Sequence, residues 1–446
     1  MHTSPFETKS VPKAYFSLAL PVVFGMIVTI FYNITDTYFI AKTGNTFLVA
    51  GVSLCAPVFT LLMAFGNIFG QGGSSMVSRR LGENRTEDIR RVSAFCFYIA
   101  IVTGAFLGGL MLAFRGTCLR ILGADTDTAP FASAYFTCMA AGAPLVVLTF
   151  IHTNLLQAEG MSKQSMIGNI GGSLVNIVLD PVFIFGLKLG AAGAAIATLL
   201  GYVFTNLYCL IVVLKKSRVL SVSVKLIAIP GRDVRQIFTI GIAAALSNIM
   251  SSFCMVLTNQ SLLPFGSDKI AAMGIVQKVS MVVMLVITGF SFGGAPLIGF
   301  YYGRKDTQML HRLLRFVGCF LGILSAVLSA VVALAAPLAV QAFLTGELAD
   351  TAAVMLRLQV AGMIFMAAVL LCQILFQATG KPASALVLAL SRQGVVFAAV
   401  LAVGTRLFGY SGIISAQPAA DFFSALLALC LAYITFRRDP VFTGRK

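Results

Sequence analysis

Residues Ala14–Ile40 read AYFSLALPVVFGMIVTIFYNITDTYFI, an apolar run whose one charged residue is Asp36. A helix needs about 20 residues to cross the hydrocarbon core of a bilayer, and this run is longer. Every backbone polar group in lipid must be bonded within the protein, so such a run forms a helix. Comparable runs follow at Phe47–Ser78, Val92–Phe114 and Phe131–Ala158. The sequence therefore predicts an all-α integral membrane protein.

The composition excludes a soluble domain. Hydrophobic residues make up 58% of the 446 residues and charged residues only 11%, whereas soluble domains carry about 25% charged residues. The 9 cysteines and 3 histidines are scattered, with no spacing typical of a metal site or redox motif. Ala14–Ile40 is too long for the core of a signal peptide and contains an acid, so no cleavable leader is expected.

Twelve transmembrane helices are expected. Most of the 32 basic residues fall in the segments on the same side as the N-terminus. This bias orients helices during insertion, so both termini are expected in the cytoplasm, in the inner (plasma) membrane. The net charge of +16 then reflects topology, not nucleic-acid binding. The expected helices cover approximately residues 14–40, 47–78, 92–114, 130–158, 164–187, 191–214, 236–263, 270–302, 312–336, 353–379, 383–408 and 411–436.

The two halves of the chain resemble each other at matching positions. The offset between matched segments varies by no more than two residues, which indicates parallel repeats of six helices each. The matched segments are Gly72-Gly73 with Gly293-Gly294, Leu156–Gly160 with Phe376–Gly380, and Gly190–Gly193 with Gly409–Gly412.

This repeat predicts an N-terminal six-helix lobe at residues 1–218, a cytoplasmic linker at 219–235 and a C-terminal six-helix lobe at 236–446. Parallel halves related by an axis along the membrane normal are a transporter architecture, in which a central cavity opens alternately to either side. The paired glycines are expected to serve helix packing, because small residues let helices approach closely.

Four charged residues are expected well inside the membrane, away from the inner and outer segments, where each costs about 2.5–3.5 kcal/mol at a helix centre on insertion scales. They are Asp36, Asp180, Arg392 and Asp421. Asp36 and Asp180 lie in the outer halves of the first and fifth helices, which run in the same direction. Asn176 precedes Asp180 by four residues and shares its helical face. These three residues are expected to converge.

Other polar groups are expected at the same depth. They are Thr198 and Ala194 on the sixth helix, Tyr32 on the first and Asn154 on the fourth. Two neighbouring carboxylates in low dielectric cannot both stay ionised without a counter-charge. Such a site can exchange a proton, or its oxygens at Asp36, Asn176 and Asp180 can hold a hard cation such as Na⁺. The alternative is that the acids only hold hydrogen bonds between helices.

Pro21 removes a backbone hydrogen bond from the first helix and is expected to bend it. Because Asp36 lies on the same helix, protonation can couple to that bend; a static kink is the alternative.

Arg392 and Asp421 are expected to pair in the second half, for either a structural role or contact with substrate or ion. The second half has no counterpart of the Asp36–Asp180 pair, so coupling is expected in the first half.

These motifs together resemble the multidrug and toxic compound extrusion (MATE) family over essentially the full length of the chain. The matching stretches are Leu20-Pro21, Phe31–Thr37, Gly70–Gly82, Gln157–Gly160, Asn176–Pro181 and Gly190–Thr198. The resemblance implies a cation site at Asp36, Asn176 and Asp180, with Thr198 and the Ala194 carbonyl as lesser members. It also implies two lobes around a central cavity.

The function that the resemblance implies is antiport: export of lipophilic, often cationic, small molecules in exchange for H⁺ or Na⁺. The expected seventh and tenth helices lack the acids found there in some branches, so the chain looks closer to the DinF-like branch, and H⁺ is favoured. We expect a monomer in the bilayer, with no cofactor besides the coupling ion. Two rival functions are a flippase for lipid-linked saccharides of the same superfamily and an intramembrane enzyme. The flippase is disfavoured because such proteins carry several basic residues in the cavity, whereas Arg392 is the one clear intramembrane base here.

Overall fold

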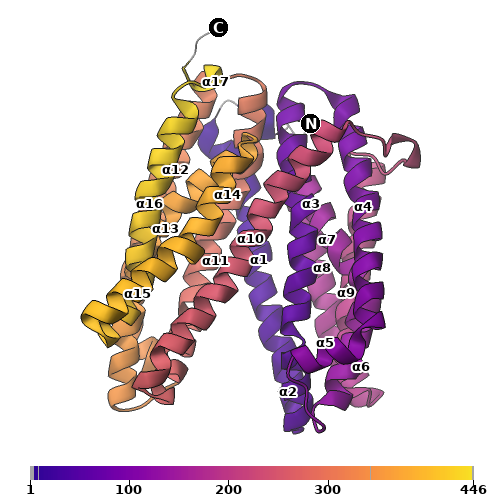
Figure 1. Ribbon diagram of the computed structural model, residues 1–446. Helices are drawn as coiled ribbons and strands as arrows, with labels where there is room; N and C mark the ends of the chain where they lie inside the picture. Colours follow the sequence, from indigo (N-terminus) through magenta and orange to yellow (C-terminus); the bar gives the residue numbers. More distant parts are fainter. Residues whose placement is uncertain (1–4, 9, 342, 444–446) are drawn as a thin grey trace. The chain divides into compact units, whose positions relative to one another are not determined.

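The computed structural model describes residues 5–8, 10–341 and 343–443, and within these ranges the chain forms helices and connecting loops (Figure 1). The first half forms η1 (Pro5–Glu7), α1 (Val11–Lys42), α2 (Thr46–Leu54), α3 (Ala56–Gly82), α4 (Thr86–Ala113), α5 (Arg115–Ile121), α6 (Ala129–Ala141), α7 (Ala143–Ala158), α8 (Ser162–Pro181), η2 (Val182–Gly186), α9 (Gly190–Lys215) and η3 (Val224–Leu226).

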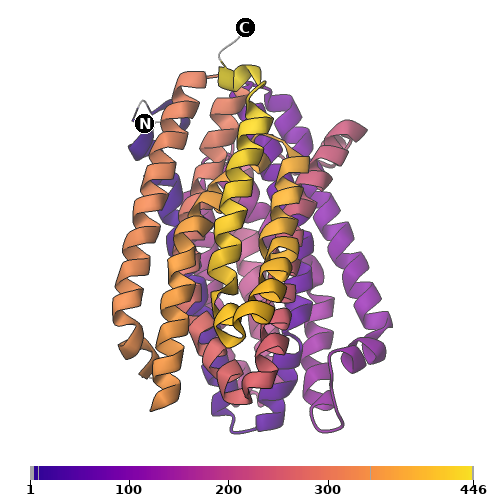
Figure 2. The same ribbon diagram turned by 60° about the vertical axis from the view of Figure 1, so that its left-hand side comes forward.

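The second half forms a similar series of long helices. They are α10 (Gly231–Leu262), η4 (Leu263–Phe265), α11 (Ser267–Gly303), α12 (Thr307–Gln341), α13 (Glu347–Ala378), α14 (Pro382–Leu390), η5 (Ser391–Val395), α15 (Val396–Phe408), α16 (Tyr410–Phe436) and α17 (Pro440–Thr443). The turned view shows the orange and yellow helices of this half running alongside one another (Figure 2).

Among the described residues, 11 helices or helix runs are long and apolar enough to cross a membrane. The pair α6–α7, bent by 53°, makes a twelfth span. The expectation of an all-α membrane protein with twelve spans is therefore confirmed. The bend follows Gly142 and a proline at the start of α7, and proline cannot supply a backbone donor within a helix. The short helix α5 was not predicted.

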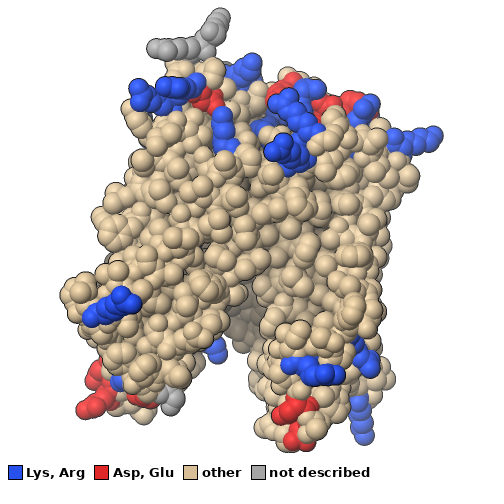
Figure 3. Space-filling model, in the orientation of Figure 1, with Lys and Arg blue, Asp and Glu red and all other residues tan. Residues whose placement is uncertain are grey.

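The surface of the spans suits lipid. Large apolar side chains stand well exposed along them, such as Phe106 on α4 and Leu334 on α12. On the face shown in Figure 3, charged side chains gather towards the upper and lower ends, and the surface between them is largely uncharged. A hydrocarbon solvent requires this arrangement, since unpaired charges are costly there.

The chain divides into two compact units. The N-terminal unit comprises Phe24–Gly241, and the C-terminal unit comprises Met1–Val23 with Ile242–Lys446. These units differ from the expected lobes, residues 1–218 and 236–446, by two helix segments. The first turns of α1 belong to the C-terminal unit, and the first turns of α10, with the expected linker 219–235, belong to the N-terminal unit.

The same helix pairs pack together in both units. In the N-terminal unit α3 and α4 each pack on α7, and α9 packs on α7 and α8. In the C-terminal unit α11 and α12 each pack on α13, and α16 packs on α13 and α15. The central helix is the fourth of its repeat in each case. This agreement supports the six-helix repeat that the sequence predicts.

Glycines allow close packing of the two helix segments that lie in the unit of the other half, which are the first turns of α1 and of α10. A Cβ atom on Gly72 of α3 would clash with the Ile237 carbonyl of α10, and one on Gly241 of α10 would clash with the Ile68 carbonyl of α3. In the C-terminal unit a Cβ atom on Gly293 of α11 would clash with the Ala19 backbone of α1. In each unit, a glycine of the repeated pair therefore contacts the backbone of the first helix of the other half. Small residues permit this close approach.

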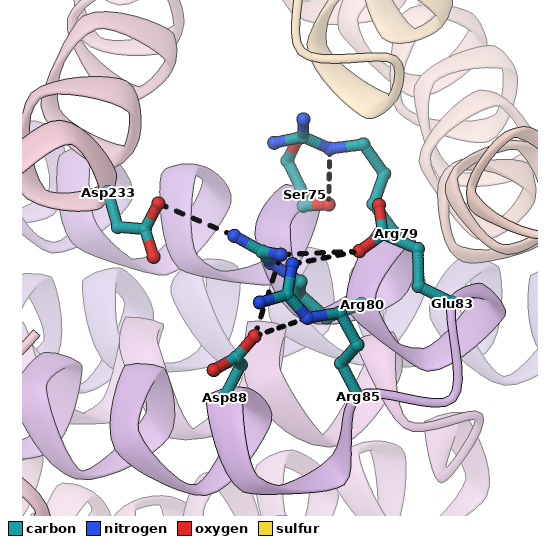
Figure 4. Close-up of polar contacts among 7 residues, drawn as sticks. All are labelled: Ser75, Arg79, Arg80, Glu83, Arg85, Asp88 and Asp233. Atoms are coloured by element: carbon teal, nitrogen blue, oxygen red, sulfur yellow. Dashed lines mark hydrogen bonds and ion pairs between the residues drawn. The ribbon is translucent and has the colours of Figure 1, made fainter. Parts of the chain in front are cut away.

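A group of ion pairs fixes the beginning of α10 in the N-terminal unit (Figure 4). Arg80 at the end of α3 lies 3.3 Å from Glu83, 3.5 Å from Asp88 and 3.5 Å from Asp233 of α10. Arg85 lies 2.7 Å from Asp88. From the sequence alone, Arg80 is expected only as one of the basic residues that orient the helices during insertion. The structure adds a contact that joins α3, α4 and α10.

The linker is also bonded to the N-terminal unit. Ser93 of α4 exchanges hydrogen bonds with Ser221, and Tyr98 donates to the Val222 carbonyl over 2.9 Å. Glu159, the acid that follows α7, accepts from the Ser217 hydroxyl at 2.6 Å and from the Arg218 amide at 3.0 Å. Burial raises the pKa of the Glu159 carboxyl, and these hydrogen bonds act in the opposite direction.

We expect Gly72→Val to lower the stability of the protein by about 1–3 kcal/mol, because the added side chain forces α3 away from α10. The measurement is the thermal midpoint in detergent, followed by reaction of the buried cysteines with a maleimide dye. Gly109→Val on α4 is the matched control, since a Cβ atom there meets no atom within 4 Å. Equal midpoints for the two variants would contradict the close contact.

Candidate functional site

Asp36, Asn176, Asp180 and Thr198 come together in the N-terminal unit. Asp36 lies near the end of α1, Asn176 and Asp180 on α8, and Thr198 on α9. α8 and α9 pack against each other along their length. The end of α1 joins them through a buried apolar cluster of Ile40, Leu48, Ile184, Ala191 and Ala194. Apolar packing between these helices therefore holds the polar groups at one level.

The carboxyl groups of Asp36 and Asp180 are neighbours, close enough to interact with each other. Asp180 is completely buried, and Asp36 is half-buried. Two carboxylates have no donor to offer each other, so a hydrogen bond between them requires one to carry a proton. The pair can exist as a shared proton, or as two carboxylates around a bound cation.

Asn176 orients the site. Its amide nitrogen donates to Asp180 Oδ1 and to the Thr198 hydroxyl, both over 3.3 Å. Its own oxygen has no donor among the described residues, and neither does Asp36 Oδ1 or Asp180 Oδ2. Buried polar atoms are normally bonded, so three buried acceptors without donors form an oxygen site that attracts a positive charge. In the described ranges no group of three or more His, Cys, Asp or Glu side chains forms a further metal site.

Two cavities border this site. One has a volume of about 300 Å³ and is lined by Asn176, Thr198 and Tyr202, among others. The second has a volume of about 340 Å³ and is lined by Asp36 and Tyr135. Tyr32 and Thr198 line both cavities. The cavity at Asp36 therefore adjoins the aromatic-lined cavity at these two shared residues.

Aromatic rings make up much of the first cavity. Phe59 and Tyr202 stack with ring centroids 6.4 Å apart, and both line the cavity with Tyr32. Aromatic faces attract organic cations and also bind neutral planar molecules. The cavity therefore suits lipophilic molecules, with the acids at one side.

Two of the expected site residues, Asn154 and Ala194, show no polar side-chain contact with the acids. The Asn154 amide donates to the Phe150 carbonyl of its own helix over 2.6 Å and lies against Gly70 of α3. Asn154 does not line either cavity. Ala194 packs in the apolar cluster one turn from Thr198, and the role of its carbonyl stays a prediction.

Pro21 lies in the body of α1. The two units meet in the sequence at Val23 and Phe24, just after this proline. α1 therefore passes from the C-terminal unit to the N-terminal unit next to a missing backbone hydrogen bond, where a helix bends most easily. Asp36 lies on the part of α1 that belongs to the N-terminal unit.

Arg392 and Asp421 lie together in the C-terminal unit, with Arg392 Nε 2.8 Å from Asp421 Oδ1. Asp421 is buried under α13, where Gly362 leaves room for it. The side chains of both residues line a cavity of about 260 Å³.

Polar groups that sequence reasoning missed lie beside the site. Tyr135 of α6 lines the cavity at Asp36. Buried His152 hydrogen-bonds Asn206 over 3.0 Å, and the Asn206 amide donates to Thr149 over 2.8 Å. Thr149 lines the aromatic cavity. Such networks can be found in a sequence from polar residues within apolar spans, and His152 and Asn206 are two such residues.

Comparison with known proteins agrees with this geometry. The MatE family model matches residues 21–182 and 243–434, one segment in each half. The chain belongs to the multidrug and toxic compound extrusion (MATE) family. It is therefore a membrane transporter and not an enzyme. The DinF-like branch stays a prediction.

MATE proteins of two staphylococci are among its relatives. The chain is 32% identical to the "Multidrug export protein MepA" of Staphylococcus haemolyticus, over 96% of this chain and 94% of the relative. It is 32% identical to the protein of the same name in Staphylococcus aureus strain NCTC 8325, over 98% and 97%. A crystal structure of MATE in the straight conformation superposes with a TM-score of 0.90 at 22% identity, covering 98% of this chain and 97% of that one.

Asp180→Asn should raise the thermal midpoint in detergent, by about 2–4 °C for each 1 kcal/mol gained. The physical reason is that the substitution removes one of two facing carboxylates, whose desolvation no basic side chain offsets. The maleimide assay described above measures this change.

Asp268→Asn is the matched control, because Asp268 is an exposed acid at the start of α11. A lower midpoint for Asp180→Asn than for the wild type would mean that the acids serve to join the helices, which was the open alternative.

Proposed function

We propose that this MATE protein is a secondary active antiporter of the plasma membrane. It exports lipophilic, often cationic, small molecules in exchange for H⁺ or Na⁺, with H⁺ favoured, by alternating access. Both termini lie in the cytoplasm. Its staphylococcal relatives are named multidrug export proteins, which supports the substrate class.

The observation that carries the proposal is the pair of facing carboxyl groups of Asp36 and Asp180. Together with Asn176 they present three buried oxygens without donors. Binding or release of one positive charge changes the net charge of this pocket. If the ion binds more tightly in one conformation than in the other, it shifts the equilibrium between them by that difference.

Because the acids border the cavities, ion binding at the acids can affect substrate binding in the cavities. Tyr32 and Thr198 line both cavities, and Thr198 accepts a hydrogen bond from Asn176. An organic cation in the aromatic cavity and an ion at the acids compete for the same negative charge. Such competition is the requirement for antiport, since the two ligands then favour alternate binding.

The rival flippase function has less support. A lipid pyrophosphate needs several basic side chains, and Arg392 already has Asp421 as a partner at 2.8 Å. In the N-terminal unit, Asp36 is the one charged residue among those that line the two cavities described above, and it is an acid.

We expect Asp36→Asn to abolish gradient-driven efflux, a fall of at least about tenfold, because a site that cannot change its charge does not shift a conformational equilibrium. Efflux of ethidium from proteoliposomes measures it. The thermal midpoint of the variant should stay at or above that of the wild type, which separates loss of coupling from loss of folding. Asp268→Asn should transport normally. Wild-type efflux rates in Asp36→Asn would remove the coupling role.

Separate gradients identify the ion. A pH gradient, acidic on the side that receives the drug, should drive efflux without sodium, whereas a sodium gradient at equal pH should not. Transport driven by sodium alone would assign Na⁺ as the coupling ion. Transport that needs neither gradient would contradict the antiport mechanism itself.

A further inference from the structure

The C-terminal unit contains its own polar cavity, of about 260 Å³. Residues from α10, α11, α13, η5, α15 and α16 line it. It has no acid pair comparable to Asp36 and Asp180. Its charged lining residues are Arg392 and Asp421, which neutralise each other.

The local backbone directs two neighbouring polar residues into this cavity. η5 is a single π-helical turn that carries Arg392 and Gln393, and both residues line the cavity. In a regular α-helix, adjacent residues are about 100° apart around the axis, whereas the wider π turn brings them closer to one face. Such turns are rare and occur frequently at functional sites.

The ion pair leaves donors of Arg392 available. Arg392 uses Nε to bind Asp421 Oδ1. No acceptor lies within hydrogen-bonding distance of its two terminal nitrogens in the described part of the chain. Asp421 is more enclosed, since 4% of its side chain is exposed compared with 13% for Arg392. A ligand in the cavity therefore meets the guanidinium group before the carboxylate.

Of the four glutamines that line the cavity, Gln393 and Gln417 have their oxygens occupied. Gln393 Oε1 accepts from the Ser251 hydroxyl, and Gln417 Oε1 accepts from the Cys254 thiol over 3.2 Å. Their amide nitrogens have no acceptor among the residues that the structure describes. The donors that this side of the cavity leaves unused are therefore the two terminal guanidinium nitrogens and these two amide nitrogens, whereas Gln277 and Gln359 contribute oxygens that accept no bond from the described residues.

The remaining lining is soft and apolar. Five methionines contribute to it: Met255, Met281, Met284, Met363 and Met366. Methionine is flexible and polarisable, so it adapts to ligands of different shapes. Phe397 adds an aromatic surface.

From this arrangement we infer that the C-terminal cavity binds lipophilic molecules through a carboxylate, zwitterions included. The carboxylate accepts from the terminal nitrogens of Arg392 and from the amides of Gln393 and Gln417, while the apolar body lies among the methionines. Asp421 keeps the guanidinium in place through Nε. A cation is disfavoured here, because it would have to displace Arg392 from the enclosed Asp421.

The inference rests on the proposed function, because it names a second class of transported molecule. It can be tested without any ion gradient. Dansylglycine and dansylglycinamide are matched probes that share one fluorophore and differ in carboxylate against neutral amide. Each is titrated into the purified full-length protein in detergent, and binding is followed by the dansyl emission, with empty micelles as the blank.

The wild type should bind dansylglycine at least about tenfold more tightly than the amide, as expected for a charge-assisted hydrogen bond. Arg392→Gln should remove this preference and leave binding of the amide unchanged. Arg406→Gln is the matched control, since Arg406 is an exposed arginine on the same helix, and it should keep the preference.

The double variant Arg392→Gln with Asp421→Asn removes both charges and leaves no buried carboxylate unpaired. It should also lose the preference, so a folding defect of the single variant does not decide the test. Equal affinity for the two probes in the wild type, absence of dansylglycine binding, or an unchanged preference in both Arg392 variants would overturn the inference. Any of these results can occur while Asp36-dependent efflux of ethidium is normal, so the two proposals fail separately.

Discussion

The two facing carboxyl groups of Asp36 and Asp180 are the constraint around which the N-terminal unit is organised. Burying them has a cost that apolar packing of α1, α8 and α9 must offset, and Asn176 satisfies only part of their hydrogen-bonding capacity. A positive charge is the natural partner for what remains. Removing that charge leaves like charges at close range in low dielectric, so the coupling that we propose between ion occupancy and conformation is electrostatic.

The fold gives this coupling a path through α1. One end of the helix carries Asp36 in the N-terminal unit, and the other end packs against Gly293 in the C-terminal unit. Pro21 lies near the boundary between the two parts. α10 shows the reverse arrangement, with its first turns packed on Gly72 and held by Arg80 and its remainder in the C-terminal unit. Each unit therefore holds one end of a helix from the other half.

The two units differ in the chemistry of their cavities. The cavities of the N-terminal unit join aromatic rings to acids, which suits cations. The C-terminal cavity joins methionines to unused donors, which suits a carboxylate. A duplicated fold allows this divergence, because the helix pairs that pack together are the same while the polar residues that line the cavities are not. A transporter with both cavities can handle molecules of opposite charge.

Length and spacing in the sequence determined the twelve spans, the repeat and the meeting of Asp36, Asn176 and Asp180. These features are local or follow from helix direction, since about 20 apolar residues must cross the bilayer as a helix and buried acids are rare. The sequence could not place Asn154 against Gly70, reveal the contact of Arg80 with Asp233, or identify the donors around Arg392. Those outcomes depend on which side chains from distant parts of the chain form hydrogen bonds with each other once the helices pack. Only the tertiary structure decides which polar groups are left without a partner, and those groups are the ones that we propose as binding groups.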